Sequence, residues 1–206
     1  DLENEISKLQ QESGYPYVVN IDTANRVNPI DGKIIMSNLC SEILQVQEPS
    51  VINNAQEYEH LGTDISCNLG STNIVNLMKS PDFERSVDVA VRALTFVTDH
   101  SSIDAVPTVK NGNSKAHTIG LGAMGLHTFF ALNQMEYGSP ESIEATDLYF
   151  RMLNFYTLKA SNKIARERGK SFEGFERSKY ATGEYFDDYI AEDVQIKSDK
   201  VKKIFE

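Results

Sequence analysis

The segment Asn38-Leu39-Cys40-Ser41-Glu42 carries the first of only two cysteines in this chain of 206 residues. Side chains alternate sides along an extended backbone, so Asn38, Cys40 and Glu42 would point to one side of a strand or loop. In a helix, about 100° of rotation per residue would turn Cys40 away from the other two. On one side, an amide, a thiol and a carboxylate could bind a polar substrate, move a proton and carry out sulfur chemistry together. A straight strand would separate Asn38 and Glu42 by about 13 Å, so we expect the segment to curl around its ligand.

The spacing alone leaves plainer roles open for the same residues. A lone cysteine is commonly a small buried hydrophobe, Asn38 could close a turn, and Glu42 could simply face water. The second cysteine, Cys67, allows an ordinary disulfide with Cys40, although two cysteines are too few for a disulfide scaffold. His60 lies between the cysteines without the close pairs of a zinc site, so we expect a surface histidine and no metal.

The composition excludes some classes of partner. A formal net charge of −10 and a pI near 4.9 argue against binding of a nucleic-acid polymer, because phosphate neutralisation needs clustered Lys and Arg. The sequence has no apolar run near the roughly 20 residues that span a bilayer, and no basic-then-apolar leader. We therefore expect a cytoplasmic protein without membrane association.

Strands and loops are expected over the first part of the chain. Residues 2–13 are polar and helix-permissive, and residues 15–21 are expected to form a short strand followed by a loop. Residues 33–47 and 64–78 are expected to be extended, with a polar connection between them. These two stretches would place Cys40 and Cys67 on or beside strands.

The chain after residue 80 is expected to be mainly helical. Ser80-Pro81 is a helix start signal, with Ser at the cap and Pro at the first helical position, and apolar residues follow at helical spacing through Val97. A loop containing Pro107 should then lead to a second helix over about 119–134.

Ser139-Pro140 repeats the start signal and predicts the longest helix, which should reach Arg168 and stop at Gly169. This helix is apolar on nearly all sides, which is typical of burial in a large structure. The last twenty residues indicate no more than a short helix.

Three glycines match the Gly-x-Gly-x-x-Gly dinucleotide fingerprint: Gly120, Gly122 and Gly125. Glu141 or Glu144 lies near the distance of a ribose-binding acid, but the fingerprint needs an apolar strand ending at its first glycine, and residues 113–119 are too polar. We therefore expect no nicotinamide or flavin site, and interpret the glycines as sites of close helix approach or of a tight turn. His127 is expected to pack or cap and not to catalyse.

Several stretches resemble, in order, signatures of the large, catalytic subunit of class Ib ribonucleotide reductase. They are residues 37–43 (SNLCSEI), 64–71 (DISCNLGS), 120–127 (GLGAMGLH), 165–169 (ARERG) and 175–186 (FERSKYATGEYF). The resemblance implies an α/β fold, as part of a ten-stranded α/β barrel with a cysteine-bearing finger loop. We take residues 1–206 as a central segment of this catalytic barrel domain, with strands and the finger loop in 1–79 and mainly helices in 80–206.

The resemblance also implies residue roles. Cys40 would become a thiyl radical that abstracts the 3′ hydrogen of a ribonucleoside diphosphate, in a site closed to water. Glu42 would take the 3′-hydroxyl proton, and Asn38 would hold the sugar hydroxyls, with Leu39 and Ser41 as further substrate contacts. Cys67 would be one of two redox thiols near Cys40, and its partner thiol would lie outside this chain.

Further partners follow from the resemblance. They are a radical-generating small subunit with a metal-tyrosyl radical, a thioredoxin- or glutaredoxin-like reductant, and a second copy of the full large subunit. No cofactor is expected in this segment, and nucleotide effectors are expected to bind outside it. The paired tyrosines of the radical path have no matching motif here. Because the family's large subunit is much longer, we expect a fragment that is inactive alone.

Two alternatives stay open. A glycyl-radical barrel enzyme also places a cysteine on a similar loop, and a helical interaction module could simply bury its cysteines. The position of Glu42 and the motif around Cys67 favour the reductase.

Overall fold

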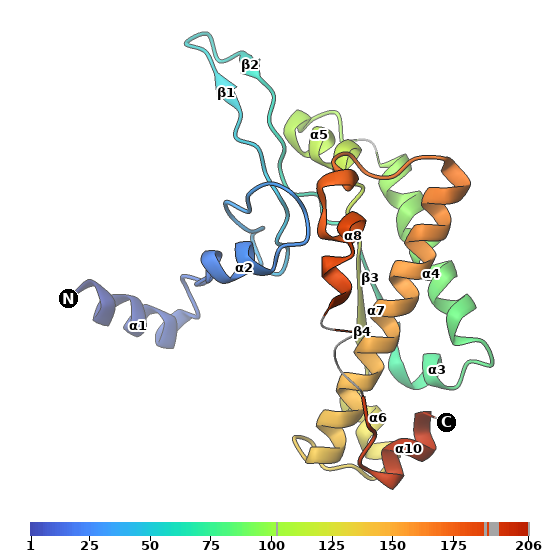
Figure 1. Cartoon of the computed structure of the whole chain (residues 1–206). Helices are drawn as coiled ribbons and strands as arrows, with labels where there is room; N and C mark the ends of the chain where they lie inside the picture. Colours follow the sequence, from blue (N-terminus) through green and yellow to red (C-terminus); the bar gives the residue numbers. More distant parts are fainter. Residues whose placement is uncertain (102, 188, 190–193, 206) are drawn as a thin grey trace. The chain divides into compact units, whose positions relative to one another are not determined.

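The computed structural model describes residues 1–101, 103–187, 189 and 194–205 (Figure 1). Their contacts divide the chain into two compact units. The first unit comprises Asp1–Ser66, Ile103–Gly112 and Gly174–Tyr185, and the second comprises Cys67–Ser102, Asn113–Glu173 and Phe186–Glu206. Cys40 lies in the first unit and Cys67 in the second.

The first unit contains short elements joined by long irregular segments. Helix α1 (Leu2–Ser13) begins at an Asp1 cap and ends at Gly14, as the polar pattern suggested. Helix α2 (Ile21–Val27) follows, and strands β1 (Val51–Ile52) and β2 (Tyr58–His60) form an antiparallel hairpin. The later part supplies the 3-10 helices η1 (Phe175–Arg177) and most of η2 (Glu184–Phe186), together with α8 (Lys179–Thr182).

The prediction of a strand over residues 15–21 is wrong. These residues are irregular up to Asn20, and α2 begins at Ile21. Pro16 has no N–H to give to a ladder, and no described strand pairs with this stretch. The side chain of Asn25 also favours the helix, because its Nδ2 donates to the carbonyl of Ile21 at 3.0 Å.

The connection between the two cysteine segments, which we predicted only to be polar, contains the β1–β2 hairpin. Its loop is closed by Asn53, whose Oδ1 accepts hydrogen bonds from the backbone N–H groups of Ala55 and Glu57, both at 2.9 Å. Val51 and Tyr58 flank this turn with strand-favouring side chains. The hairpin signal was therefore present in the sequence.

Parallel pairing of β3 (Leu69–Asn73) with β4 (Gly120–Met124) organises the second unit. The register runs from Leu69 opposite Gly120 to Asn73 opposite Met124. Helices α3 (Ile74–Met78) and α4 (Phe83–His100) follow β3, and α5 (Pro107–Ala116), which begins in the first unit, precedes β4. Then come α6 (Leu126–Leu132), α7 (Pro140–Arg168) and α10 (Asp199–Phe205). A parallel pair joined by helices is the repeating unit of α/β folds.

The helix expected over 119–134 is only partly correct, because its first part is strand β4 and helix α6 starts at Leu126. Glycine lowers helix propensity and permits close approach of the two strands. A Cβ at Gly120 would lie 2.6 Å from Cδ2 of Leu69. Gly125 has φ of +82° and separates the strand from α6, which fits the tight turn that we predicted.

Two further helix boundaries differ from expectation. Helix α5 begins at Pro107, in a region where we predicted a loop, and Pro suits the first helical position. Helix α4 is capped by Asp82 instead of Ser80, because the Asp82 carboxylate accepts the backbone N–H of Arg85 at 2.8 Å. The hydroxyl of Ser80 instead bonds Ser86 at 2.9 Å.

Helix α7 has the predicted ends. Ser139 caps it, Pro140 is the first helical residue, and Gly169 ends it with φ of +65°. Helix α10 confirms the short helix expected near the end of the chain. Apart from β4, the regular elements after residue 80 in the described part of the chain are helical, which confirms the predicted helical character.

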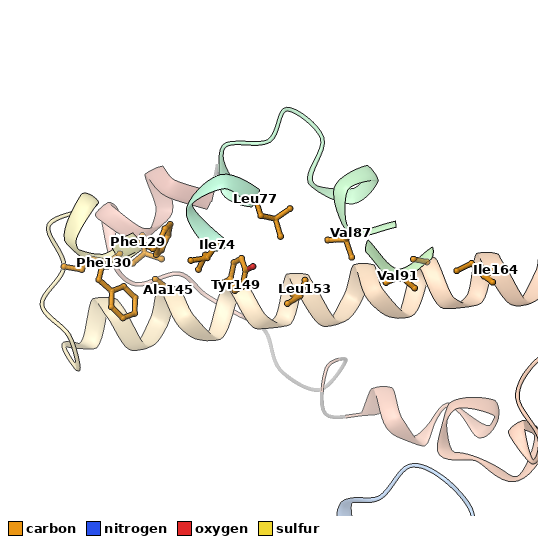
Figure 2. Close-up of a cluster of buried hydrophobic side chains, with 13 residues drawn as sticks. Ile74, Leu77, Val87, Val91, Phe129, Phe130, Ala145, Tyr149, Leu153 and Ile164 are labelled. Atoms are coloured by element: carbon orange, nitrogen blue, oxygen red, sulfur yellow. The ribbon is translucent and has the colours of Figure 1, made fainter. Parts of the chain in front are cut away.

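One face of α7 carries the core of the second unit, as Figure 2 shows. Ala145, Tyr149, Leu153 and Ile164 point toward α3, α4 and α6, which contribute a further set of buried residues: Ile74, Leu77, Val87, Val91, Phe129 and Phe130. Each large apolar side chain buried in this way stabilises the fold by about 1.5–3 kcal/mol. Other sides of α7 are less covered by the described residues, since Ile143 and Phe155 are 62% and 59% exposed.

Tyr149 links this core to the strand pair. Its side chain is fully buried, and its hydroxyl lies 3.1 Å from the Thr72 hydroxyl, which donates to the carbonyl of Gly122 at 3.0 Å. Burial raises the pKa of the Tyr149 phenol, against a smaller opposing effect of the Thr72 hydrogen bond. The described residues form two two-stranded sheets and no closed barrel.

Candidate active site

The segment that carries Cys40 is a curled loop. The backbone N–H of Ser41 donates to the carbonyl of Asn38 at 3.0 Å, and the N–H of Ile43 donates to Oδ1 of Asn38 at 2.9 Å. Ser41 has φ of +65°, which is uncommon for a residue other than glycine. The loop therefore bends at its centre, as we predicted. We predict that the side chains of Asn38, Cys40 and Glu42 meet at one ligand, and this stays a prediction.

Side-chain amides hold the base of this loop. Oε1 of the buried Gln47 accepts the N–H groups of Ile35 and Met36 at 3.1 and 2.9 Å, and the Gln47 N–H donates to the carbonyl of Lys33 at 3.1 Å. Asn25 bonds both backbone groups of Ile34 at 2.9 Å. These positions were not identified from the sequence, because amides separated by many residues leave no local pattern.

A third amide ties the loop to the segment that follows the hairpin. Nε2 of Gln45 donates to the carbonyl of Ser66 at 2.8 Å, and the Ser66 N–H donates back to Oε1 at 3.3 Å. Such a reciprocal pair imitates one rung of a β-ladder. It fixes Gln45 without a regular strand, and within the described residues no strand pairs with the stretch 33–47 that we expected to be extended.

The loop tip is open to solvent within this chain. Cys40 and Glu42 are exposed, Leu39 is 91% exposed, and Asn38 and Ser41 are half-buried. The described residues thus do not close the surroundings of Cys40 to water in the way that we expected for a radical site. That closure stays a prediction for a complete subunit.

Two tyrosines, to which we assigned no role, lie in the same unit as Cys40. The rings of Tyr15 and Tyr17 are 4.9 Å apart at an interplanar angle of 35°. The pKa of the Tyr17 phenol is raised, first by its hydrogen bond with Tyr15 and least by the negative charge that Cys40 can carry. The two rings therefore pack against each other.

Cys67 lies just before β3, in the second unit. Its side chain is exposed, whereas the neighbouring Asn68 is buried. Both cysteines are described, and neither forms a disulfide. The predicted proximity of Cys40 to Cys67 stays a prediction, since the two residues belong to separate units.

The weaker candidates have structural partners. Nε2 of His60 lies 3.1 Å from a carboxylate oxygen of Glu48, and both side chains are about half exposed. The His127 ring lies 6.2 Å from the ring of Tyr137. Within residues 1–101, 103–187, 189 and 194–205, no cluster of three potential metal ligands occurs.

The acids beside the glycine motif hold α10 in place. Glu144 accepts the backbone N–H groups of Lys197 and Ser198 at 2.6 and 3.0 Å, and Glu141 pairs with Lys200 at 3.2 Å. Gly120 also begins a strand instead of following one. Among the described helices, none is both long and apolar enough to cross a membrane.

Comparisons with known proteins give a consistent result. The family model described as "Ribonucleotide reductase, barrel domain" matches residues 1–204. The ribonucleoside-diphosphate reductase subunit alpha of Mycoplasma pneumoniae is 43% identical over 205 residues, which are 98% of this chain and 28% of that protein. The corresponding subunit of Bacillus subtilis is 42% identical over 207 residues, 100% of this chain and 30% of that protein.

A solved structure supports the fold. The alpha subunit of the Actinobacillus ureae class Id ribonucleotide reductase superposes with a TM-score of 0.66 at 23% identity, covering 89% of this chain and 33% of that one. The chain thus spans less than a third of the length of the curated relatives that it matches. It belongs to the ribonucleotide reductase family and corresponds to part of the barrel domain of the alpha subunit.

Proposed function

We propose that this chain is the central, cysteine-bearing part of a ribonucleoside-diphosphate reductase large subunit, which converts ribonucleoside diphosphates into 2′-deoxyribonucleoside diphosphates. The observation that carries the proposal is the identity of about 40% along the whole chain to alpha subunits. The curled loop that presents Cys40 supports it. The same comparisons favour a reductase over a glycyl-radical enzyme or a helical module.

Cys40 would start and end the reaction. As a thiyl radical it takes the 3′ hydrogen atom of the ribose, and it returns a hydrogen atom to the same carbon in the last step. Its place at an exposed loop tip allows direct contact with a sugar. The radical would be supplied by a metal-tyrosyl centre in a separate small subunit.

Glu42 would accept the proton of the 3′-hydroxyl, which helps the 2′-hydroxyl to leave as water. Asn38 would act mainly as a donor, because its Oδ1 already accepts the Ile43 N–H. Its Nδ2 makes no hydrogen bond within the described part of the chain, and so can bind a sugar hydroxyl. The Ser41 N–H is already bonded to Asn38, which leaves the Ser41 hydroxyl and carbonyl, and the exposed Leu39, as substrate contacts.

Cys67 and a second thiol elsewhere in the large subunit would supply the reducing equivalents. The balance is one ribonucleoside diphosphate and two thiols giving one deoxyribonucleoside diphosphate, one water and one disulfide. A thioredoxin- or glutaredoxin-like protein would then reduce the disulfide. A homodimer of the large subunit, effector nucleotides bound outside this segment, and a cytoplasmic location complete the proposal.

The two cysteines provide matched variants for a test in the complete large subunit, assayed with its small subunit and a reductant. Cys40→Ser should abolish all chemistry, including cleavage of the 3′ C–H bond, which is followed with a 3′-deuterated substrate. Cys67→Ser should abolish deoxynucleotide formation but still permit C–H cleavage, because Cys40 is intact. Turnover by Cys40→Ser at more than about a thousandth of the wild-type rate would contradict the proposal.

A further inference from the structure

We propose that a buried amide pair, Asn68 with Asn113, positions Cys67 for its redox step. This inference rests on the proposed function, since it assigns a role in the reaction of Cys67. Both residues lie in the second unit together with Cys67. Neither was singled out as a functional residue from the sequence.

The pair connects several segments of the second unit. Nδ2 of Asn68 donates to Oδ1 of Asn113 at 2.9 Å and to the carbonyl of Thr118 at 3.1 Å. Nδ2 of Asn113 donates to the carbonyl of Thr98 at 2.8 Å. Asn68, the residue beside Cys67, is thereby bonded to α5 and to the segment that enters β4, and through Asn113 it is linked to the end of α4.

Burial makes these hydrogen bonds consequential. Asn68 and Asn113 are only 6% and 5% exposed. A buried polar group that loses its partner costs about 1–3 kcal/mol, and a fully bonded buried network tends to specify a single local arrangement. An apolar pair could fill the same space without fixing the direction of the chain. The hydrogen bonds of the amide pair therefore hold the Asn68 side chain in one buried position.

That position determines which way Cys67 faces. Along Cys67-Asn68-Leu69 the side chains are exposed, buried and exposed, as expected where neighbouring residues of an extended chain point to opposite sides. The carbonyl of Asn68 also accepts the N–H of Gly120 at 2.9 Å, next to the first rung of the β3–β4 ladder. A shift of the strand register by one residue would turn the Cys67 side chain toward the interior.

Orientation matters because a disulfide has narrow geometric limits, with Cα atoms usually 4.4–6.8 Å apart in such bonds. In the redox step, Cys67 and its partner thiol each lose a proton and an electron and form one S–S bond. The two electrons and two protons pass to the substrate. A backbone that holds Cys67 outward raises the effective concentration of one thiol near the other and stabilises the disulfide. Asn68 and Asn113 are thus positioning residues.

The test measures the reduction potential of the Cys67 disulfide in the complete large subunit. The protein is equilibrated with defined ratios of reduced and oxidised dithiothreitol, and the thiol state of Cys67 is read by alkylation and mass spectrometry. Asn68→Ala should lower the effective concentration about tenfold, which raises the potential by about 30 mV for a two-electron couple. Asn113→Ala should shift it in the same direction by less, because Asn68 keeps its bond to Thr118.

Tyr149→Phe is the matched control, since it removes one buried hydrogen bond to Thr72 of β3 without touching the residues around Cys67. It should lower stability but leave the potential within a few millivolts. Wild-type potentials in both asparagine variants, at a stability loss like that of the control, would overturn the inference. If Asn68→Ala does not fold, Asn113→Ala decides alone. Absence of any Cys67 disulfide in the wild-type protein after turnover would instead contradict the proposed function.

Discussion

Asn38 illustrates how one residue can serve both the fold and the reaction. Its Oδ1 closes the loop through the Ile43 N–H, and its backbone carbonyl accepts the Ser41 N–H. The loop and the proposed substrate contact thus depend on different atoms of the same side chain. A variant that changes one group and preserves the other can separate the two roles.

Asn38→Asp provides that separation, because a carboxylate still accepts the Ile43 N–H but has no N–H to donate. We expect the loop to keep its turn, with amide hydrogen exchange of Ile43 in the 206-residue chain within about threefold of wild type. In the complete enzyme, kcat/KM should fall at least about tenfold from the lost donor and the added negative charge. Asn38→Ala is the comparison, and should increase Ile43 exchange as well. Unchanged kcat/KM in Asn38→Asp would remove the amide from the mechanism.

At the scale of elements, α7 shows which features local sequence can predict. Ser139, Pro140 and Gly169 act within a few residues of the helix ends, so the pattern was sufficient. The β4 strand and the Gln47 and Asn25 bonds depend on partners far away in the sequence. They could not be deduced from periodicity. The curl of the 38–42 segment was predictable, because a straight strand would hold Asn38 and Glu42 too far apart to contact the same ligand.

The α7 cap offers a direct test of this local control. The Ser139 hydroxyl accepts the Ser142 N–H at 3.2 Å, so Ser139→Ala should lower the free energy of unfolding by about 1 kcal/mol. Ser139→Asp retains an acceptor and adds a favourable charge at the helix N-terminus, and should stay within about 0.5 kcal/mol of wild type. Urea denaturation of the chain measures both. Equal losses in the two variants would show that the cap hydrogen bond is not responsible.

The ends of α4 and α7 are joined by an ion pair with a predictable pH dependence. Arg168 bonds both carboxylate oxygens of Asp99, and His117 lies 3.4 Å from the same carboxylate. The pKa of Asp99 is lowered, first by the hydrogen bond from Arg168. A lowered folded-state pKa adds stability above the unfolded-state value of 3.8, and this contribution is lost as the pH falls through the folded-state pKa.

Arg168→Gln should therefore lower the free energy of unfolding at pH 7 by up to about 1 kcal/mol, a modest value because the pair is partly exposed. The difference from wild type should shrink as the pH falls below about 4. Lys159→Gln is the control, because it breaks a half-exposed pair with Glu84 between the same helices and should lower stability by less than Arg168→Gln does. A difference for Arg168→Gln that is constant from pH 7 to pH 2 would contradict the assignment to Asp99.

For the whole molecule, cysteine content limits what the chain can do. The proposed reaction consumes two thiols while Cys40 carries the radical, and the sequence contains only Cys40 and Cys67. The isolated chain should therefore form no deoxynucleotide when supplied with a small subunit, substrate and dithiothreitol. Product analysis by chromatography measures this, with the complete large subunit as the positive control. Catalytic turnover by the 206 residues would show that Cys67 needs no second protein thiol.

The two-stranded parallel sheet carries one more consequence. Within the described residues, β3 and β4 pair only with each other, so each strand has one edge without a neighbouring strand. Parallel strands are normally covered on both faces and continued by neighbours, and bare edges promote intermolecular pairing. When produced alone, the chain will lose part of its yield to insoluble material, and supplying the rest of the subunit in the same cells will raise the soluble fraction.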